Sequence, residues 1–256
     1  MSKSRAFGVF VVLAVFCLAL GTARADVYMK QKIHTGSVTV MGQTQPEKDE
    51  IAAYWLGENK ARTDHDTGKS TIFLAEKGLI YVIDHNKKTY MEMPLDAGKA
   101  MDEAVAGKGE QGRKVAEMMK GMTKGMMGGM TVKVTETGET KKIGSWHCRK
   151  YLIDMKMSMG ETNSEAWATE DLKIDAKLYF TSLNAMMASM PGFQDMIKEM
   201  QKVKGVVAYQ VTTAKVMGSD VKTTMELVEC ADKSAPAGTY DLPEGYAKVK
   251  GMKGMN

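Results

Sequence analysis

Short runs of alternating apolar and polar residues fill the N-terminal part of the chain and predict β-strands. The runs are Val27 to Met41, Glu50 to Leu56, Thr71 to Ala75, Leu79 to Asp84 and Lys88 to Met93. Turn sequences such as Asp66-Thr67-Gly68 and Lys77-Gly78 separate them. Connections this short join only antiparallel neighbours, so the pattern predicts a meander.

Strand patterns return after residue 129. They are Met130 to Thr137, Trp146 to Met159, Ser164 to Thr169, Gly205 to Met217 and Val221 to Cys230. One helix interrupts them, because the apolar residues from Phe193 to Val203 recur at intervals of three and four residues. We expect this helix to cover a sheet, and the fold class predicted is α+β with helices laid against an antiparallel sheet.

The strand from Trp146 has one apolar and one polar face. Tyr151, Ile153, Met155 and Met157 alternate with Lys150, Asp154 and Lys156. The apolar set is therefore expected on the cavity or core side.

Residues 1 to 25 have the features of a secretory signal peptide. Lys3 and Arg5 precede an uncharged apolar run from Phe7 to Leu20, and Ala23-Arg24-Ala25 supplies a small-x-small cleavage site. The run is short for a bilayer helix, which needs about 20 residues. We expect cleavage before Asp26, loss of Cys17 with the signal, and a periplasmic or secreted protein.

Charge changes the expected partners. The 35 basic residues exceed the 31 acidic ones by four, but Lys3, Arg5 and Arg24 lie in the predicted signal peptide. The remaining chain is nearly neutral, which disfavours a nucleic-acid partner. We expect one domain from 26 to 247 with a Met/Gly-rich helical insertion at about 95–130, and a flexible tail at 248–256.

Cys148 and Cys230 remain after cleavage. Counted along their strands, both fall among the polar positions, and an exported protein meets oxidising conditions. This favours a disulfide between them. A free thiol, or a metal pair with His147, is the alternative.

The insertion repeats Lys-Gly-Met, and a helix there would align Met118, Met122 and Met126 on one stripe. Packing over the barrel mouth is one interpretation. The others are contact with an apolar ligand or a membrane surface, and Cu(I) coordination by thioethers.

Catalytic signatures are missing from the sequence. Gly107 to Gly112 fits G-x-G-x-x-G but follows no strand, and the chain contains no H-E-x-x-H, C-x-x-C or G-x-S-x-G. An enzyme is thus the least supported class, and no cofactor is expected.

Several segments resemble a group of uncharacterised exported bacterial proteins, a family with a domain of unknown function. They are Trp55 to Asp64, Ile80 to Tyr90, Gly144 to Tyr151 with Cys148, Trp167, and Tyr240 to Tyr246. That group is similar to the periplasmic lipoprotein carriers and receptors LolA and LolB. The resemblance implies an incompletely closed antiparallel β half-barrel covered by helices, with a concave apolar face that holds lipid chains in the carriers.

The function expected is a periplasmic protein that binds a lipid acyl chain or another apolar ligand, with possible transient contact to the membrane surface or envelope proteins. The alternatives are a methionine-rich copper-handling protein and a structural envelope protein without a small ligand. The residues expected to line the cavity are Tyr81, Ile83, Tyr151, Ile153, Met155, Met157, Phe193, Met196, Ile197 and Met200.

Overall fold

A computed structural model shows one sheet of twelve strands and a separate two-stranded ribbon. The structure describes residues 25–40, 42–96, 130–157, 160–172, 193–216 and 218–249, isolated residues between 109 and 121, and residues 174 and 178. The first eight strands are β1 (Asp26–Thr35), β2 (Val38–Val40), β3 (Gln43–Gln45), β4 (Lys48–Gly57), β5 (Lys60–His65), β6 (Lys69–Leu74), β7 (Leu79–Asp84) and β8 (Thr89–Pro94). The others are β9 (Thr131–Ile143), β10 (Trp146–Met157), β11 (Gly160–Thr169), β12 (Val206–Val216), β13 (Ser219–Lys233) and β14 (Ala247–Lys248).

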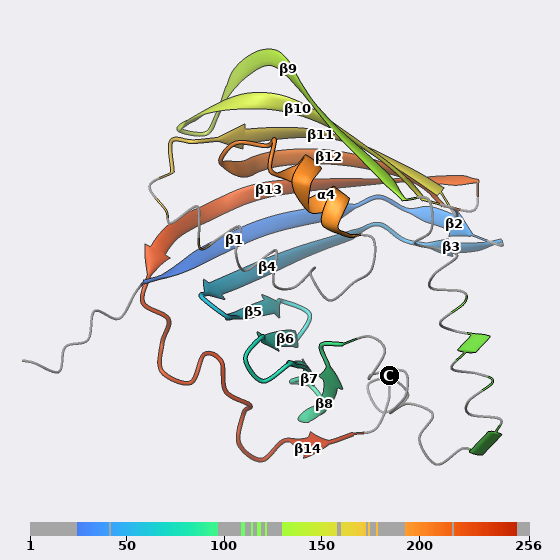
Figure 1. The fold of residues 1–256 in the computed structure, drawn as a ribbon, viewed down its shortest axis with the longest axis vertical. Coiled ribbons are helices and arrows are strands. Elements are labelled where there is room, and N and C mark those ends of the chain that lie inside the picture. The colour runs from blue at the N-terminus through green and yellow to red at the C-terminus, as the bar shows by residue number, and fades with distance from the viewer. Residues whose placement is uncertain are drawn as a thin grey trace, which may run out of the picture.

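Two antiparallel meanders make up most of the sheet (Figure 1). One runs from β4 to β8 and the other from β9 to β13. Strand β1 lies between β4 and β13 and pairs antiparallel with both, so it joins the two meanders. The predicted strands and their antiparallel order are confirmed, whereas the position of β1 was not predicted.

Tight turns set the register of the first meander. Gly68 and Gly78 have φ values of 81° and 62°, in the left-handed region that glycine adopts without a steric penalty. Any Cβ on Gly68 would meet the Asn86 side chain at 2.7 Å, so this turn also lies against the next hairpin.

The helix α4 (Phe193–Met200) confirms the helix predicted from the periodicity. The α+β class is nevertheless wrong, because the described residues are nearly all β and helices do not cover the sheet. Eight residues span about 12 Å of helix, whereas neighbouring strands lie about 4.8 Å apart. A helix of this length covers two or three of the twelve strands.

Two clusters of buried side chains form the core. The larger one contains Val27 of β1 together with Leu56 and Phe73 from the first meander and Trp167 and Leu227 from the second. The smaller one lies under α4. The hydrophobic core therefore extends across both meanders.

The segment after β13 returns to the first meander. Strand β14 pairs in parallel with β8, and Tyr240 donates a hydrogen bond to Asp26 at 2.9 Å. Arg62 Nη1 donates to the Thr239 carbonyl at 2.9 Å. Burial, and then the bond to Asp26, raises the pKa of Tyr240. These contacts attach the C-terminal segment to β1, β5 and β8.

A chain of hydrogen bonds fixes the end of this segment. Ser70, 1% exposed, donates to Asp64 at 2.5 Å, and Arg62 Nε donates to the same carboxylate at 2.8 Å. Because the Ser70 hydroxyl donates its hydrogen bond to Asp64, it acts as the acceptor toward His85 Nε2, which lies 2.7 Å away. His85 Nδ1 then accepts from the Tyr246 hydroxyl at 3.0 Å. Every donor thus meets an acceptor, as buried polar groups require.

Several predictions lie outside the described residues. These are the signal peptide before residue 25, most of the insertion, and the tail from residue 250. Within the described part of the chain, no helix has the length and hydropathy needed to span a bilayer.

Candidate functional site

The apolar face of β10 packs under α4, as the alternation predicts. Tyr151 is fully buried and Ile153 is 6% exposed, and both belong to one cluster with Val203 and the partly buried Met200. Met196 is also buried. The structure therefore brings these predicted residues together as a packed core. We call the side of the sheet on which α4 packs the α4 face.

Polar contacts hold α4 to the edge strand β9. The Val134 N–H donates to the Glu199 carboxylate at 3.0 Å, and Lys202 donates to the same side chain at 2.5 Å. The hydrogen bond from Lys202 is the largest cause that lowers the pKa of Glu199, and the bond from the Val134 N–H adds to it. Tyr151 Oη accepts from the Lys204 N–H at 3.4 Å, so the chain after the helix is also held.

The apolar side chains of β10 continue beyond α4. Met155 is half-buried and Met157 is 39% exposed, although they share the α4 face with Tyr151 and Ile153. Val132 of β9 lies directly opposite Met155 and is half-buried too. This accessible apolar stretch of the α4 face, formed by Val132, Met155 and Met157, is the candidate site.

The other predicted residues have different positions. Ile83 is fully buried in β7, and Tyr81 packs edge-on against Tyr90 with ring centroids 6.0 Å apart. Strand β7 belongs to the first meander, so the structure does not bring these two residues to β10. Ile197 is half-buried on α4, and the side chain of Phe193 lies outside the described residues.

Sequence reasoning missed the polar residues of the α4 face. Ser164 lies opposite Ile153, and Thr212 lies opposite Ser164. Gln210 is on the same face, since it lies opposite Ala166, which itself lies opposite Tyr151. Ser164 is only 7% exposed. A serine that shares the core-facing periodicity of Ala166 and Ala168 was the available signal.

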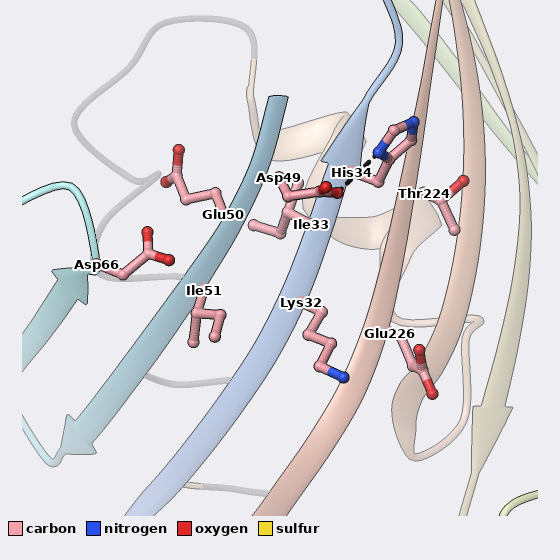
Figure 2. A pocket seen from close by; sticks show the side chains of 9 residues that line it. All are labelled: Lys32, Ile33, His34, Asp49, Glu50, Ile51, Asp66, Thr224 and Glu226. Atoms are coloured by element: carbon pink, nitrogen blue, oxygen red, sulfur yellow. Dashed lines mark hydrogen bonds and ion pairs between the residues drawn. The ribbon is translucent and has the colours of Figure 1, made fainter. Parts of the chain in front are cut away.

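A pocket of about 450 Å³, lined mostly by charged and polar residues, lies elsewhere, across β1, β4 and β13 (Figure 2). Its lining residues are Lys32, Ile33, His34, Asp49, Glu50, Ile51, Asp66, Thr224 and Glu226. The register places Lys32, His34 and Glu226 on the face opposite α4, since they alternate with Ile33 and Met225.

Ion pairs already occupy much of this pocket. His34 Nδ1 lies 2.8 Å from Asp49 Oδ1, as Figure 2 shows. Glu50 is contacted by Lys48 and by His65. The hydrogen bond from Lys48 is the main cause that lowers the pKa of Glu50, and His65 adds to it. The strand pairing that brings these charges together is not visible as a sequence motif.

The copper alternative finds little in the described residues. Met118 is 61% exposed, while Met122 and Met126 lie outside the described part. Within the ranges that the structure describes, no three His, Cys, Asp or Glu side chains gather into a metal site.

Both cysteines are free thiols, so the expected Cys148–Cys230 disulfide is not present. The positions inferred for them were wrong. Cys148 is 1% exposed and lies opposite Thr169, which is also 1% exposed. The adjacent residue of that strand, Ala168, points to the other face and is buried too, so both faces of the sheet are covered here. A register shift between Lys30 and Gln31 brings Cys230 opposite the buried Met29. A β-bulge of this kind reverses the alternation that the sequence count assumes.

Comparison with known proteins identifies a family but no activity. A family model described as a domain of unknown function, DUF4412, matches residues 34–246. No curated protein matches the chain. Among solved structures, a DUF1329 family protein from Desulfovibrio piger matches with 8% sequence identity and a TM-score of 0.21, over 85% of this chain and 90% of that chain. A TM-score this low carries no argument about function.

Proposed function

Because the chain belongs to the DUF4412 family, whose description names no activity, we propose its function from its own geometry: an exported binding protein that holds an apolar ligand on the α4 face. Its hairpins resemble a group of exported proteins that is in turn similar to the periplasmic lipoprotein carriers, and this supports a lipid acyl chain as the ligand. The predicted signal peptide supports a periplasmic location, with membrane or envelope proteins as transient partners.

One observation carries this proposal. Along the α4 face of β10, exposure rises from zero at Tyr151 and 6% at Ile153 to 39% at Met157. The adjacent residue Lys156 points to the other face of β10 and is exposed, as is usual for a charged side chain. A methionine exposed on the side that packs the core suits a binding surface, because the flexible thioether adapts to apolar ligands of different shape.

Burial of a ligand chain on this surface provides the driving force. Each methylene removed from water contributes about 0.8 kcal/mol. The fully packed cluster around Tyr151 holds α4 and β10 in place, while Val132, Met155 and Met157 provide the accessible part. The protein then acts by sequestering the ligand, without chemistry on it.

The test is binding of the neutral apolar fluorophore N-phenyl-1-naphthylamine to the chain from residue 26. We expect Met157→Asp to weaken binding at least tenfold, because an unpaired carboxylate is costly to desolvate against an apolar ligand. The fold should survive, since this side chain is 39% exposed.

Lys156→Asp is the matched control, because it places the same carboxylate one residue away on the opposite face. It should leave fluorophore binding unchanged. The proposal is wrong if the unmodified protein binds no apolar probe, or if both variants weaken binding equally. Thermal melts of the three proteins separate loss of binding from loss of fold.

A further inference from the structure

Three hydrogen-bonded polar side chains lie within the apolar part of the α4 face. Ser164 Oγ and Thr212 Oγ1 are 2.8 Å apart, and Gln210 Nε2 donates to Thr212 Oγ1 at 2.9 Å. Ser164 is 7% exposed, and the other two are half-buried. We call these three residues the polar triplet.

The strand register places the polar triplet beside the candidate site. One cross-strand row runs through Val134, Ile153, Ser164, Thr212, Thr223 and Thr35. The next row runs through Val132, Met155, Thr162, Ala214 and Val221. A third row runs through Tyr151, Ala166, Gln210, Met225 and Ile33. The hydroxyl groups of Thr162 and Ser164 on β11 are therefore the direct and diagonal cross-strand neighbours of Met155, and Thr212 and Gln210 follow on β12.

These three rows contain no charged residue between β10 and β1. Charges occur only at their ends, with Glu136 on β9 opposite Tyr151, and Lys48 and Glu50 on β4. The residues that alternate with the rows on the opposite face include Lys156, Glu161, Glu165, Lys215, Lys222 and Glu226, all of them exposed. Within these three rows, the stretch from β10 to β1 on the α4 face is thus uncharged, whereas the opposite face of the same stretch carries these six charges.

An ionised group bound at the uncharged middle of these rows would lose water without gaining a counter-charge from the rows themselves, which is costly. The charged side chains Glu199 and Lys202 lie at Val134 on β9, and they already pair with each other. A neutral hydroxyl, ester or amide would instead replace its water hydrogen bonds with bonds to the polar triplet. The same surface therefore discriminates between ligand head groups by their charge.

We infer that the ligand is an uncharged amphiphile whose neutral head group binds Ser164, Gln210 and Thr212 while its chain lies along Met155 and Met157. The inference rests on the proposed function and narrows the ligand class. The row of Met157 lies four residues along β10 from the row of Ser164, which is about 13 Å at about 3.3 Å per residue. That length suits an acyl or alkyl chain.

The experiment displaces N-phenyl-1-naphthylamine from the chain beginning at residue 26 with three ligands of equal chain length. They are monopalmitoylglycerol, which is neutral, palmitate, which is anionic, and hexadecyltrimethylammonium, which is cationic. All are used below their micelle-forming concentrations. We expect monopalmitoylglycerol to displace the fluorophore at a concentration at least tenfold lower than either charged ligand.

Thr212→Val tests the head-group contact, and Thr213→Val is its control on the opposite face of the same strand. Loss of one hydrogen bond should raise the monopalmitoylglycerol concentration needed for displacement by about 2- to 10-fold in Thr212→Val. Fluorophore affinity should change by less than twofold, because the fluorophore binds through its aromatic rings and has a single weak N–H donor. Thr213→Val should match the unmodified protein in both measurements.

The outcomes separate this inference from the proposed function. The protein could bind the fluorophore and yet bind palmitate as tightly as monopalmitoylglycerol, or more tightly. This result would overturn the inference of a neutral ligand but not the proposed function. Equal effects of Thr212→Val and Thr213→Val would overturn the role of the polar triplet. Absence of fluorophore binding to the folded, unmodified protein would overturn both proposals.

Discussion

Burial controls the chemistry of Cys148 and Cys230. Burial raises the pKa of Cys230 from 9.0 to about 11, and the nearby Asp232 and Glu229 add to the shift. Burial likewise raises the pKa of Cys148. Since the thiolate is the reactive form, both thiols should be poor nucleophiles while the protein is folded.

Thiol labelling of the chain from residue 26 checks this prediction. At pH 8 a pKa of about 11 leaves about 100-fold less thiolate than the usual value, so Cys230 should react about 100-fold more slowly in the folded protein than in urea. Unfolding without reductant should release two reactive thiols. Two thiols that react at the unfolded rate in the native protein, or none after unfolding, would contradict the buried free cysteines.

The C-terminal segment depends on single side chains to stay attached. Ser70 connects Asp64 to His85, and His85 connects to Tyr246. We expect Ser70→Ala to lower the free energy of unfolding by about 1–3 kcal/mol, because it leaves the His85 Nε2–H without its acceptor. Tyr246→Phe should cost about 1 kcal/mol.

Urea unfolding of a double-mutant cycle measures whether these bonds act together. Both changes break the same chain of hydrogen bonds, so the double variant should be less destabilised than the sum of the single variants. Ser219→Ala is a control, since that hydroxyl donates to the Thr39 carbonyl and takes no part in this chain of hydrogen bonds. Strict additivity would show that the bonds are independent.

Local alternation made most strands predictable. The pairing between strands far apart in the sequence could not be predicted in this way. The strands from β4 to β8 follow from period-two patterns separated by turns such as the one at Gly78. The place of β1 beside β13 depends on contacts about 200 residues apart in the chain, which no local pattern contains. The helix predicted at α4 is confirmed. Because α4 has only eight residues, it does not change the nearly all-β character of the described residues.

Local alternation predicted the part of the candidate site that lies on β10, and no other part of it. The alternation from Tyr151 to Met157 identified the α4 face of β10 correctly. The count of alternating positions failed where register determines the face, as for Cys230. It also could not show that Ile83 lies in the other meander, away from β10. The polar triplet was missed because apolar periodicity does not select a buried serine or glutamine.

At the scale of the whole molecule, β1 holds the two meanders together. It pairs with β4 on one side and with β13 on the other, and its first residue, Asp26, also accepts a hydrogen bond from Tyr240. Cleavage after Ala25 would therefore leave the entire sheet intact. A cut inside β1 would remove strand pairs from both meanders.

The processing site that the sequence predicts comes directly before the first residue of β1, and the last prediction concerns this site. When the full chain is produced in a bacterium, the protein recovered from the periplasm should begin at Asp26, as judged by intact mass. Ala25→Lys should block cleavage, because signal peptidase requires a small residue there, whereas Arg24→Lys, at the unconstrained middle position, should not. A mass that retains residues 1 to 25, or an acyl group on Cys17, would contradict export by this route.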